Sequence, residues 1–241
     1  MYKTARVRQE LAYIMKTTDS KYQGWIVFGV FLLAFAVAWI AGAIWGIAAT
    51  QFGRSLGLND AVISTLSLLG IAVIRGVIWI PITRMVLKRR LWEMAFQFRH
   101  GWWQDLLVGI GISSLAISVI FLVAIKAGWS VIEGWIWQSQ PSDVLLGKLW
   151  VSLLINALVA IVEEIAFRAY LLTGLKETWG KSIGLAVMAV TFSFMHAPAL
   201  EGYPPFTIAY ALLMMAAFGV MFGWVYLRTG FLWLPTGIHF A

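Results

Sequence analysis

Apolar segments long enough to cross a bilayer recur along the chain and most strongly limit its fold. A transmembrane helix needs about 20 apolar residues, because each backbone polar group must be satisfied within the segment. Hydrophobic residues make up 61% of the chain and charged residues 12%. A soluble domain of this length could not bury so much apolar surface. The expected fold class is therefore all-α, a polytopic transmembrane helical bundle.

The segments predict about six complete spans plus the start of a seventh, which begins after Arg228. The fourth is longer than a bilayer requires, so it must tilt or project from the membrane. Asn59 or Asp60 predicts the N-cap of the second span. The six spans are expected at residues 24–50, 60–87, 106–127, 144–178, 182–197 and 206–227.

Basic residues lie mainly at the ends of the apolar segments and predict the orientation. Residues 1–23 are basic and are expected to face the cytoplasm, which puts Lys88–Arg90, Lys176 with Lys181, and Arg228 on the same side. The net charge of +7 then reflects topology and contacts with anionic membrane lipids, and no nucleic-acid partner is expected. We expect a multi-pass protein of the cell membrane.

Three regions are expected along the chain. Residues 1–23 form the cytoplasmic juxtamembrane segment, residues 24–143 hold the first three transmembrane helices and their loops, and residues 144–241 form the core of the functional site. The chain has no cysteine, which excludes disulfides, thiolate metal sites and a cysteine nucleophile.

Two adjacent carboxylates, Glu163 and Glu164, interrupt the fourth apolar segment. A carboxylate is costly in the membrane interior, so it indicates a functional site. Glu164 and Arg168 are four residues apart and can pair on one helix face. Glu163 then faces a mostly apolar lining with Asn156 nearby, which suits a general base or acid. The alternative is a structural ion pair between Glu164 and Arg168.

His196 ends the fifth apolar segment at a depth that matches Glu163. Counted at 1.5 Å per residue from the turn at Trp179–Lys181, Glu163 lies about 25 Å along one helix and His196 about 24 Å along the next. Antiparallel neighbours would bring the two side chains together. The alternative is that His196 is an interfacial or packing residue. His100 is interpreted as interfacial.

Arg75 lies well inside the second span, followed by Pro81. An arginine within a membrane span is a candidate functional residue, and an acidic partner from another helix is expected. The alternative is a side chain that extends along a tilted helix to the membrane surface.

Three motifs follow in order: EExxxR at Glu163, Glu164 and Arg168; FxxxH at Phe192 and His196; and His239 after the stretch Thr-Gly-Phe-Leu-Trp-Leu-Pro. In this combination residues 144–241 resemble the CPBP intramembrane protease family, also called the Abi or CAAX prenyl protease family. The family's last motif usually reads HxxxN. The sequence ends two residues after His239, within an apolar segment, so we expect the chain to continue.

The resemblance implies roles for these residues. Glu163 would activate water, and Glu164 with Arg168 would orient the site. His196 and His239 would bind the water, the developing oxyanion or a metal, with Phe192 lining the pocket. Asn156, which helix spacing places near Glu163, is the other expected pocket residue. If a metal takes part, zinc held by His196, His239 and Glu163 is the candidate, although the sequence makes no cofactor certain.

The expected function is that of an intramembrane endopeptidase acting on a membrane-associated or prenylated peptide. The alternative is a non-catalytic membrane scaffold or immunity protein of the same fold that regulates a partner. A third reading, a proton-coupled carrier using Arg75, Glu163 and His196, would predict repeated halves, and the sequence has no repeat.

Overall fold

The computed structural model describes residues 2–139 and 141–240, with the side chains of 22–138 and 141–240. The side chains of Lys3, Arg6, Arg8, Lys16 and Lys21, which carry the predicted basic segment, lie outside this description. The described residues form helices and no strand, so the all-α prediction is confirmed. The elements are α1 (Tyr2–Ser55), α2 (Asp60–Val77), α3 (Trp79–Val86), α4 (Leu91–Met94), α5 (Trp102–Lys126), α6 (Ile136–Ser139), α7 (Ser142–Glu163), η1 (Glu164–Leu172), α8 (Thr173–Thr178), α9 (Lys181–Met195), η2 (Ala197–Leu200), α10 (Pro205–Thr229) and α11 (Trp233–Phe240).

Five helical stretches in the described part of the chain are long and apolar enough to cross a membrane. The predicted fifth span differs, because it forms the shorter helix α9. The start of a seventh helix is present as α11, which begins at Trp233 after three bent residues. The five stretches are Tyr22–Ser55, Asp60–Val86, Trp102–Lys126, Ser142–Thr178 and Pro205–Thr229. The chain is thus a multi-pass membrane protein.

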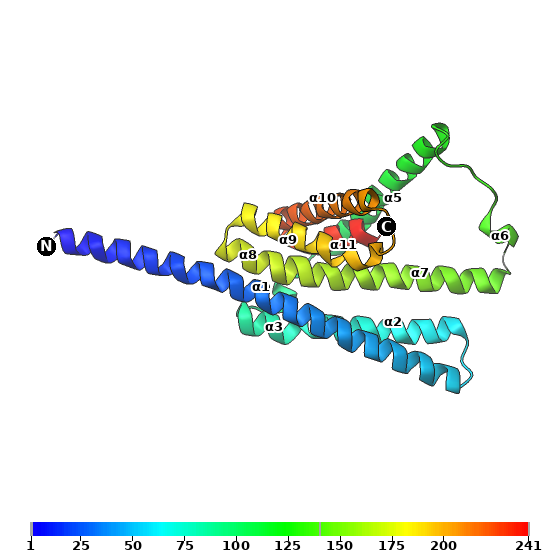
Figure 1. Cartoon of the computed structure of the whole chain (residues 1–241), viewed down its shortest axis with the longest axis horizontal. Coiled ribbons are helices and arrows are strands. Elements are labelled where there is room, and N and C mark those ends of the chain that lie inside the picture. The colour runs from blue at the N-terminus through cyan, green and yellow to red at the C-terminus, as the bar shows by residue number, and fades with distance from the viewer. Residues whose placement is uncertain (1, 140, 241) are drawn as a thin grey trace.

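Successive helices pack mostly as antiparallel neighbours (Figure 1). Helix α1 packs along α2, α2 along α7, and α9 along both α8 and α10. Asn59 caps α2, and its side chain accepts a hydrogen bond from the Val62 amide at 2.9 Å. Gly180, with a φ of 86°, allows the sharp turn between α8 and α9.

The core is centred on η1, a π-helical segment inside the long fourth span. All nine of its residues are buried. Phe167 packs against Phe31 with ring centroids 5.2 Å apart, and Tyr170 packs against Trp79 at 5.2 Å. The Tyr170 hydroxyl donates to the Val27 carbonyl at 3.3 Å. A π-helical turn within an α-helix is rare and is often found at functional sites.

Two glycines allow α9 and α10 to approach closely, as their spacing predicts. A Cβ added at Gly219 would lie 2.9 Å from the Ala189 Cα, and one added at Gly223 would lie 2.5 Å from the Met188 side chain. Helix α10 therefore packs closely on α9, and its buried residues include Phe222.

The stretch after α3, which contains the short helix α4, packs against the bundle. Leu91 and Met94 of α4 are buried, and the Met94 carbonyl accepts a hydrogen bond from the Tyr226 hydroxyl at 3.0 Å. The Arg89–Glu177 ion pair, at 3.0 Å, joins this stretch to the end of α8. The basic residues of both segments therefore lie at the same end of the bundle, as the charge pattern predicts.

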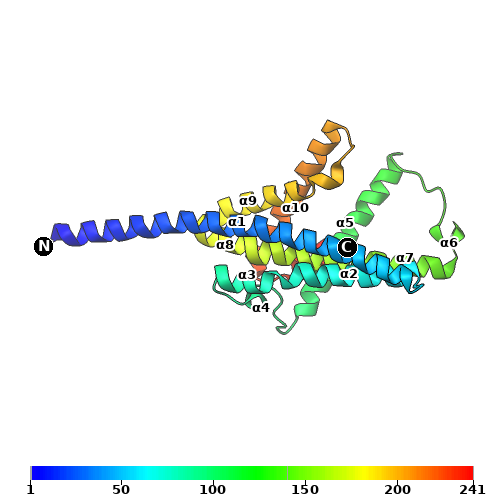
Figure 2. The same cartoon turned by 60° about the horizontal axis from the view of Figure 1, so that its bottom comes forward.

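Helix α5 packs against α11 and then extends away from the other helices (Figures 1 and 2). A glycine pair allows the contact. A Cβ at Gly109 would lie 2.8 Å from the Ile238 backbone nitrogen, and one at Gly237 would meet the Gly109 Cα at 3.1 Å. Helix α11, which carries His239, is therefore held directly against the α5 backbone.

Candidate active site

A buried ion pair lies at the base of the site. Glu164 and Arg168 have no exposed side-chain surface, and Glu164 Oε1 lies 3.1 Å from Arg168 Nη1. The same oxygen lies 3.1 Å from His239 Nδ1. The predicted Glu164–Arg168 pair is confirmed, and it extends to a histidine seventy-five positions along the chain.

Glu163 projects on the accessible side of this pair, between two histidines. Its Oε1 lies 3.9 Å from His196 Nε2, and its Oε2 lies 3.7 Å from His239 Nε2. The predicted proximity of Glu163 and His196 is confirmed. The side chains are 22% exposed for Glu163, 29% for His196 and 17% for His239, so small molecules can reach them. Separations above 3.5 Å leave room for a bridging water.

Hydrogen bonds select one tautomer for each imidazole in its neutral form. The His196 Nδ1 atom lies 2.7 Å from the Phe192 carbonyl oxygen, and His239 Nδ1 faces the Glu164 carboxylate. Both partners are acceptors, so Nδ1 carries the proton and donates. Nε2 of each ring is then an acceptor directed toward Glu163. The site can accept hydrogen bonds from a water held among these three side chains.

Aromatic rings enclose the cluster. Phe192 packs against the His196 ring with centroids 4.7 Å apart, and the His239 ring stacks on Phe222 at 4.9 Å and 16°. The Arg168 guanidinium lies 4.6 Å from the Phe192 ring centroid and 5.0 Å from that of Phe222. These contacts stabilise the buried cation and hold both imidazoles in place.

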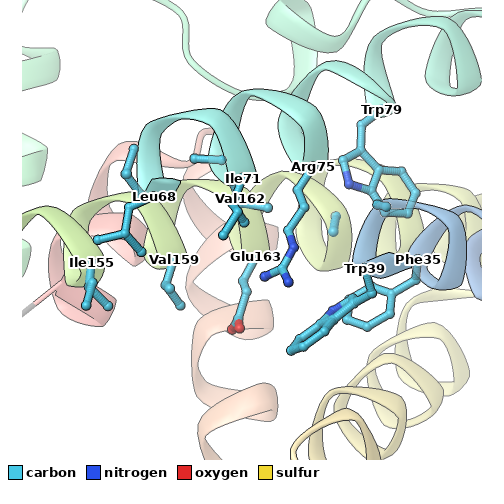
Figure 3. A pocket seen from close by; sticks show the side chains of 14 residues that line it. Phe35, Trp39, Leu68, Ile71, Arg75, Trp79, Ile155, Val159, Val162 and Glu163 are labelled. Atoms are coloured by element: carbon cyan, nitrogen blue, oxygen red, sulfur yellow. The ribbon is translucent and has the colours of Figure 1, made fainter. Parts of the chain in front are cut away.

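A largely apolar cavity of about 160 Å³ opens beside Glu163 (Figure 3). Helices α1, α2 and α7, the first residue of α3 and the start of η1 line it, and Arg75 and Glu163 are its charged side chains. Figure 3 shows the Arg75 guanidinium and the Glu163 carboxylate directed into the same space. The Arg75 guanidinium lies 4.0 Å from the Trp39 ring centroid. The acidic residue expected near Arg75 is therefore Glu163.

One predicted pocket residue lies elsewhere. Asn156 is exposed, and its amide donates to the Ser152 carbonyl of its own helix at 3.0 Å. The structure therefore does not bring Asn156 into the cluster, because the seven residues that separate it from Glu163 place it about 10 Å away along the helix axis. His100 is exposed, as an interfacial residue would be.

Two site residues were missed by sequence reasoning. Phe222 stacks on His239, and Trp39 stacks on the Arg75 guanidinium. Both belong to apolar helices that are rich in similar aromatic residues, so no local signal distinguishes them. Only the packing of α1 and α10 against the site reveals them.

The side chains of the cluster include donor types that could hold a metal ion. Two histidines and a carboxylate are the donor types of a catalytic zinc, and each Nδ1 has the acceptor partner usual for a ligand. However, no group of three or more His, Cys, Asp or Glu side chains among the described residues is arranged to hold a metal. The separations of 3.7 and 3.9 Å exceed the roughly 3.3 Å expected between tetrahedral zinc ligands. We therefore derive no step through a metal.

The part of the chain that carries this cluster is also the part that is similar to a known protein family. Neither the curated proteins nor the solved structures give a significant match. Residues 145–241 match the family described as Type II CAAX prenyl endopeptidase Rce1-like. The matched region contains Glu163, Glu164, Arg168, His196 and His239, whereas Arg75 and Trp39 lie outside it. The resemblance to the CAAX prenyl protease family is therefore supported over residues 145–241, the part of the chain that carries the cluster.

Proposed function

We propose that the protein is an intramembrane endopeptidase in which Glu163 activates the water that attacks a peptide carbonyl. The observation that supports this most directly is the position of the Glu163 carboxylate, with its two oxygens facing His196 Nε2 and His239 Nε2 at 3.9 and 3.7 Å. A water among these groups donates one hydrogen bond to the carboxylate and the other to an imidazole nitrogen.

Glu163 acts first as a base and then as an acid. It takes a proton from the water while the water oxygen adds to the carbonyl carbon, giving a tetrahedral intermediate with a negative oxygen. The intermediate then collapses, the C–N bond breaks, and Glu163 gives its proton to the leaving nitrogen. The products are a carboxylic acid and an amine, and Glu163 returns to its carboxylate form.

Glu164 and Arg168 are positioning residues in this proposal. Glu164 accepts a hydrogen bond from His239 Nδ1 and pairs with Arg168, so it fixes the imidazole tautomer and orientation. The π-helical segment supports this role, because it buries both charged residues while Glu163, one position earlier, stays accessible.

The proposed substrate is a peptide at the membrane, of the prenylated CAAX type named by the matched family. The cavity beside Glu163 is largely apolar and lies between membrane-spanning helices. Such a lining favours a substrate that already partitions into the bilayer. We also propose that the amino terminus and the basic end of the bundle, where Arg89 pairs with Glu177, face the cytoplasm.

The test is cleavage of prenylated and transmembrane peptides by the purified full-length protein in liposomes, followed by mass spectrometry. Glu163→Gln is expected to reduce kcat by about 10²–10⁴-fold, because it removes the base without changing the size of the side chain. Glu201→Gln is the control, since Glu201 is exposed on the loop after η2. Repeating the assay with a chelator determines whether a metal is required.

A folded parent protein that cleaves no peptide would contradict the protease proposal and favour a scaffold that regulates a partner. Cleavage that survives Glu163→Gln at the parent rate would contradict the role of Glu163.

A further inference from the structure

Arg75 is the charged residue of the site for which the proposed reaction has given no role. It belongs to α2, yet it lines the same cavity as Glu163. Its Nε is buried and has no hydrogen-bond partner among the described residues. A buried polar group without a partner is costly, so its retention indicates a ligand that completes it.

The surroundings of Arg75 direct its donor groups into the cavity. The guanidinium carbon lies 4.0 Å from the Trp39 ring centroid, so one face of the group is covered. Gly42 of α1 borders the side chain, and a Cβ at that position would lie 3.0 Å from Arg75 Nε. With one face stacked and its stem against α1, the guanidinium presents N–H groups along its edge.

The reaction gains from a positively charged donor beside the negative oxygen. In the neutral tautomers with Nδ1 protonated, His196 Nε2 and His239 Nε2 are acceptors that face Glu163 and its water. Arg168 is buried beneath the site and paired with Glu164 at 3.1 Å. Of the charged donors described near Glu163, Arg75 is the one that lines the cavity.

We propose that Arg75 is a further catalytic residue, whose guanidinium binds the negative oxygen of the tetrahedral intermediate. This inference rests on the proposed peptidase function. The substrate chain lies in the cavity between Arg75 and Glu163, with the carbonyl oxygen toward Arg75. The carbonyl carbon then faces the water held by Glu163 and the histidines.

The movement of charge explains why this arrangement favours the reaction. Before the attack, the negative charge near Arg75 is on the Glu163 carboxylate. When Glu163 takes the water proton it becomes neutral, and the same negative charge appears on the carbonyl oxygen. Arg75 lies beside both positions and carries its positive charge throughout. The transition state therefore forms in an apolar cavity without an unpaired charge.

The test combines kinetics with binding of a phosphinate peptide, which carries an anionic tetrahedral group in place of the cleaved bond. Arg75→Gln is expected to reduce kcat by about 10²–10³-fold and to change KM little, because the contact forms mainly in the transition state. Its affinity for the phosphinate is expected to fall by a similar factor. Arg75→Lys is expected to recover part of both losses, since it keeps the charge without the planar fork.

Arg84→Gln is the matched control, because Arg84 is an exposed arginine in α3 of the same span. Affinity for the cleavable peptide is measured in a Glu163→Gln background, where no hydrolysis interferes. That affinity is expected to be the same with and without Arg75→Gln. If Arg75→Gln does not fold, the phosphinate affinity of Arg75→Lys decides the question: a loss supports the proposal, and no change overturns it.

The outcomes separate this inference from the proposed function. If the parent cleaves peptides and Arg75→Gln keeps both kcat and phosphinate affinity, the oxyanion role is wrong and the peptidase function stands. If Arg75→Gln weakens the peptide and the phosphinate equally, Arg75 binds the ground state, and the inference is again overturned. If the parent neither cleaves peptides nor binds the phosphinate, both proposals fail.

Discussion

Replacing Arg168 by methionine should destabilise the fold strongly, because it leaves Glu164 charged in a fully buried position. Both side chains have no exposed surface and their charged atoms lie 3.1 Å apart. Removing one partner of a buried pair costs about 3–5 kcal/mol of unfolding free energy. For a protein of this size that corresponds to a fall in Tm of roughly 6–20 °C.

The measurement is thermal unfolding of the parent, Arg168→Met, Glu164→Gln and the double variant in the same detergent. The double variant is expected to recover at least about 2 kcal/mol of the loss, because it leaves no unpaired buried charge. Arg89→Met is the control. It breaks the exposed Arg89–Glu177 pair and should cost at most about 1 kcal/mol. Additive losses in the double variant would show that Glu164 and Arg168 do not stabilise the fold as a buried pair.

Two further predictions concern the supports of the site. Gly109→Ala should displace α11 and lower both Tm and kcat, because its Cβ would lie 2.8 Å from the Ile238 backbone nitrogen. Gly111→Ala is the control, since a Cβ there would meet nothing within 4 Å, and it should change neither Tm nor kcat. Tyr226→Phe should cost about 1–3 kcal/mol of unfolding free energy, because it removes the hydroxyl that bonds Thr173 Oγ1 at 2.9 Å and the Met94 carbonyl at 3.0 Å. Chemical unfolding checks it, and a Tyr226→Phe variant as stable as the parent would contradict the prediction.

The fold class was predictable because a bilayer permits few structures. An apolar segment of sufficient length must be a helix, whatever its exact sequence. The points at which these helices are interrupted were harder to predict. Helix α2 ends at Val77, close to Pro81, and the long fourth helix contains the π-helical segment η1. The first has a local cause, because Pro81 has no N–H to donate to the Val77 carbonyl. The π-helical segment depends on packing around the helix, which a hydropathy pattern does not contain.

The candidate site was predictable where one helix or one turn relates its members. Spacing within a helix placed Glu164 beside Arg168, and the short turn at Gly180 placed His196 near Glu163. The bond between Glu164 and His239 could not be derived this way, since helices distant in the sequence bring them together. The position of Arg75 in the Glu163 cavity has the same origin.

The central claim is that Glu163, His196 and His239 act together on one water molecule. The most direct measurement is the cleavage rate in liposomes of Glu163→Gln, His196→Gln and the double variant, at equal amounts of folded protein. Residues that act as a unit give losses that are far from additive. If the three residues act as a unit, the double variant is no slower than Glu163→Gln alone. Losses that multiply in the double variant would contradict that claim.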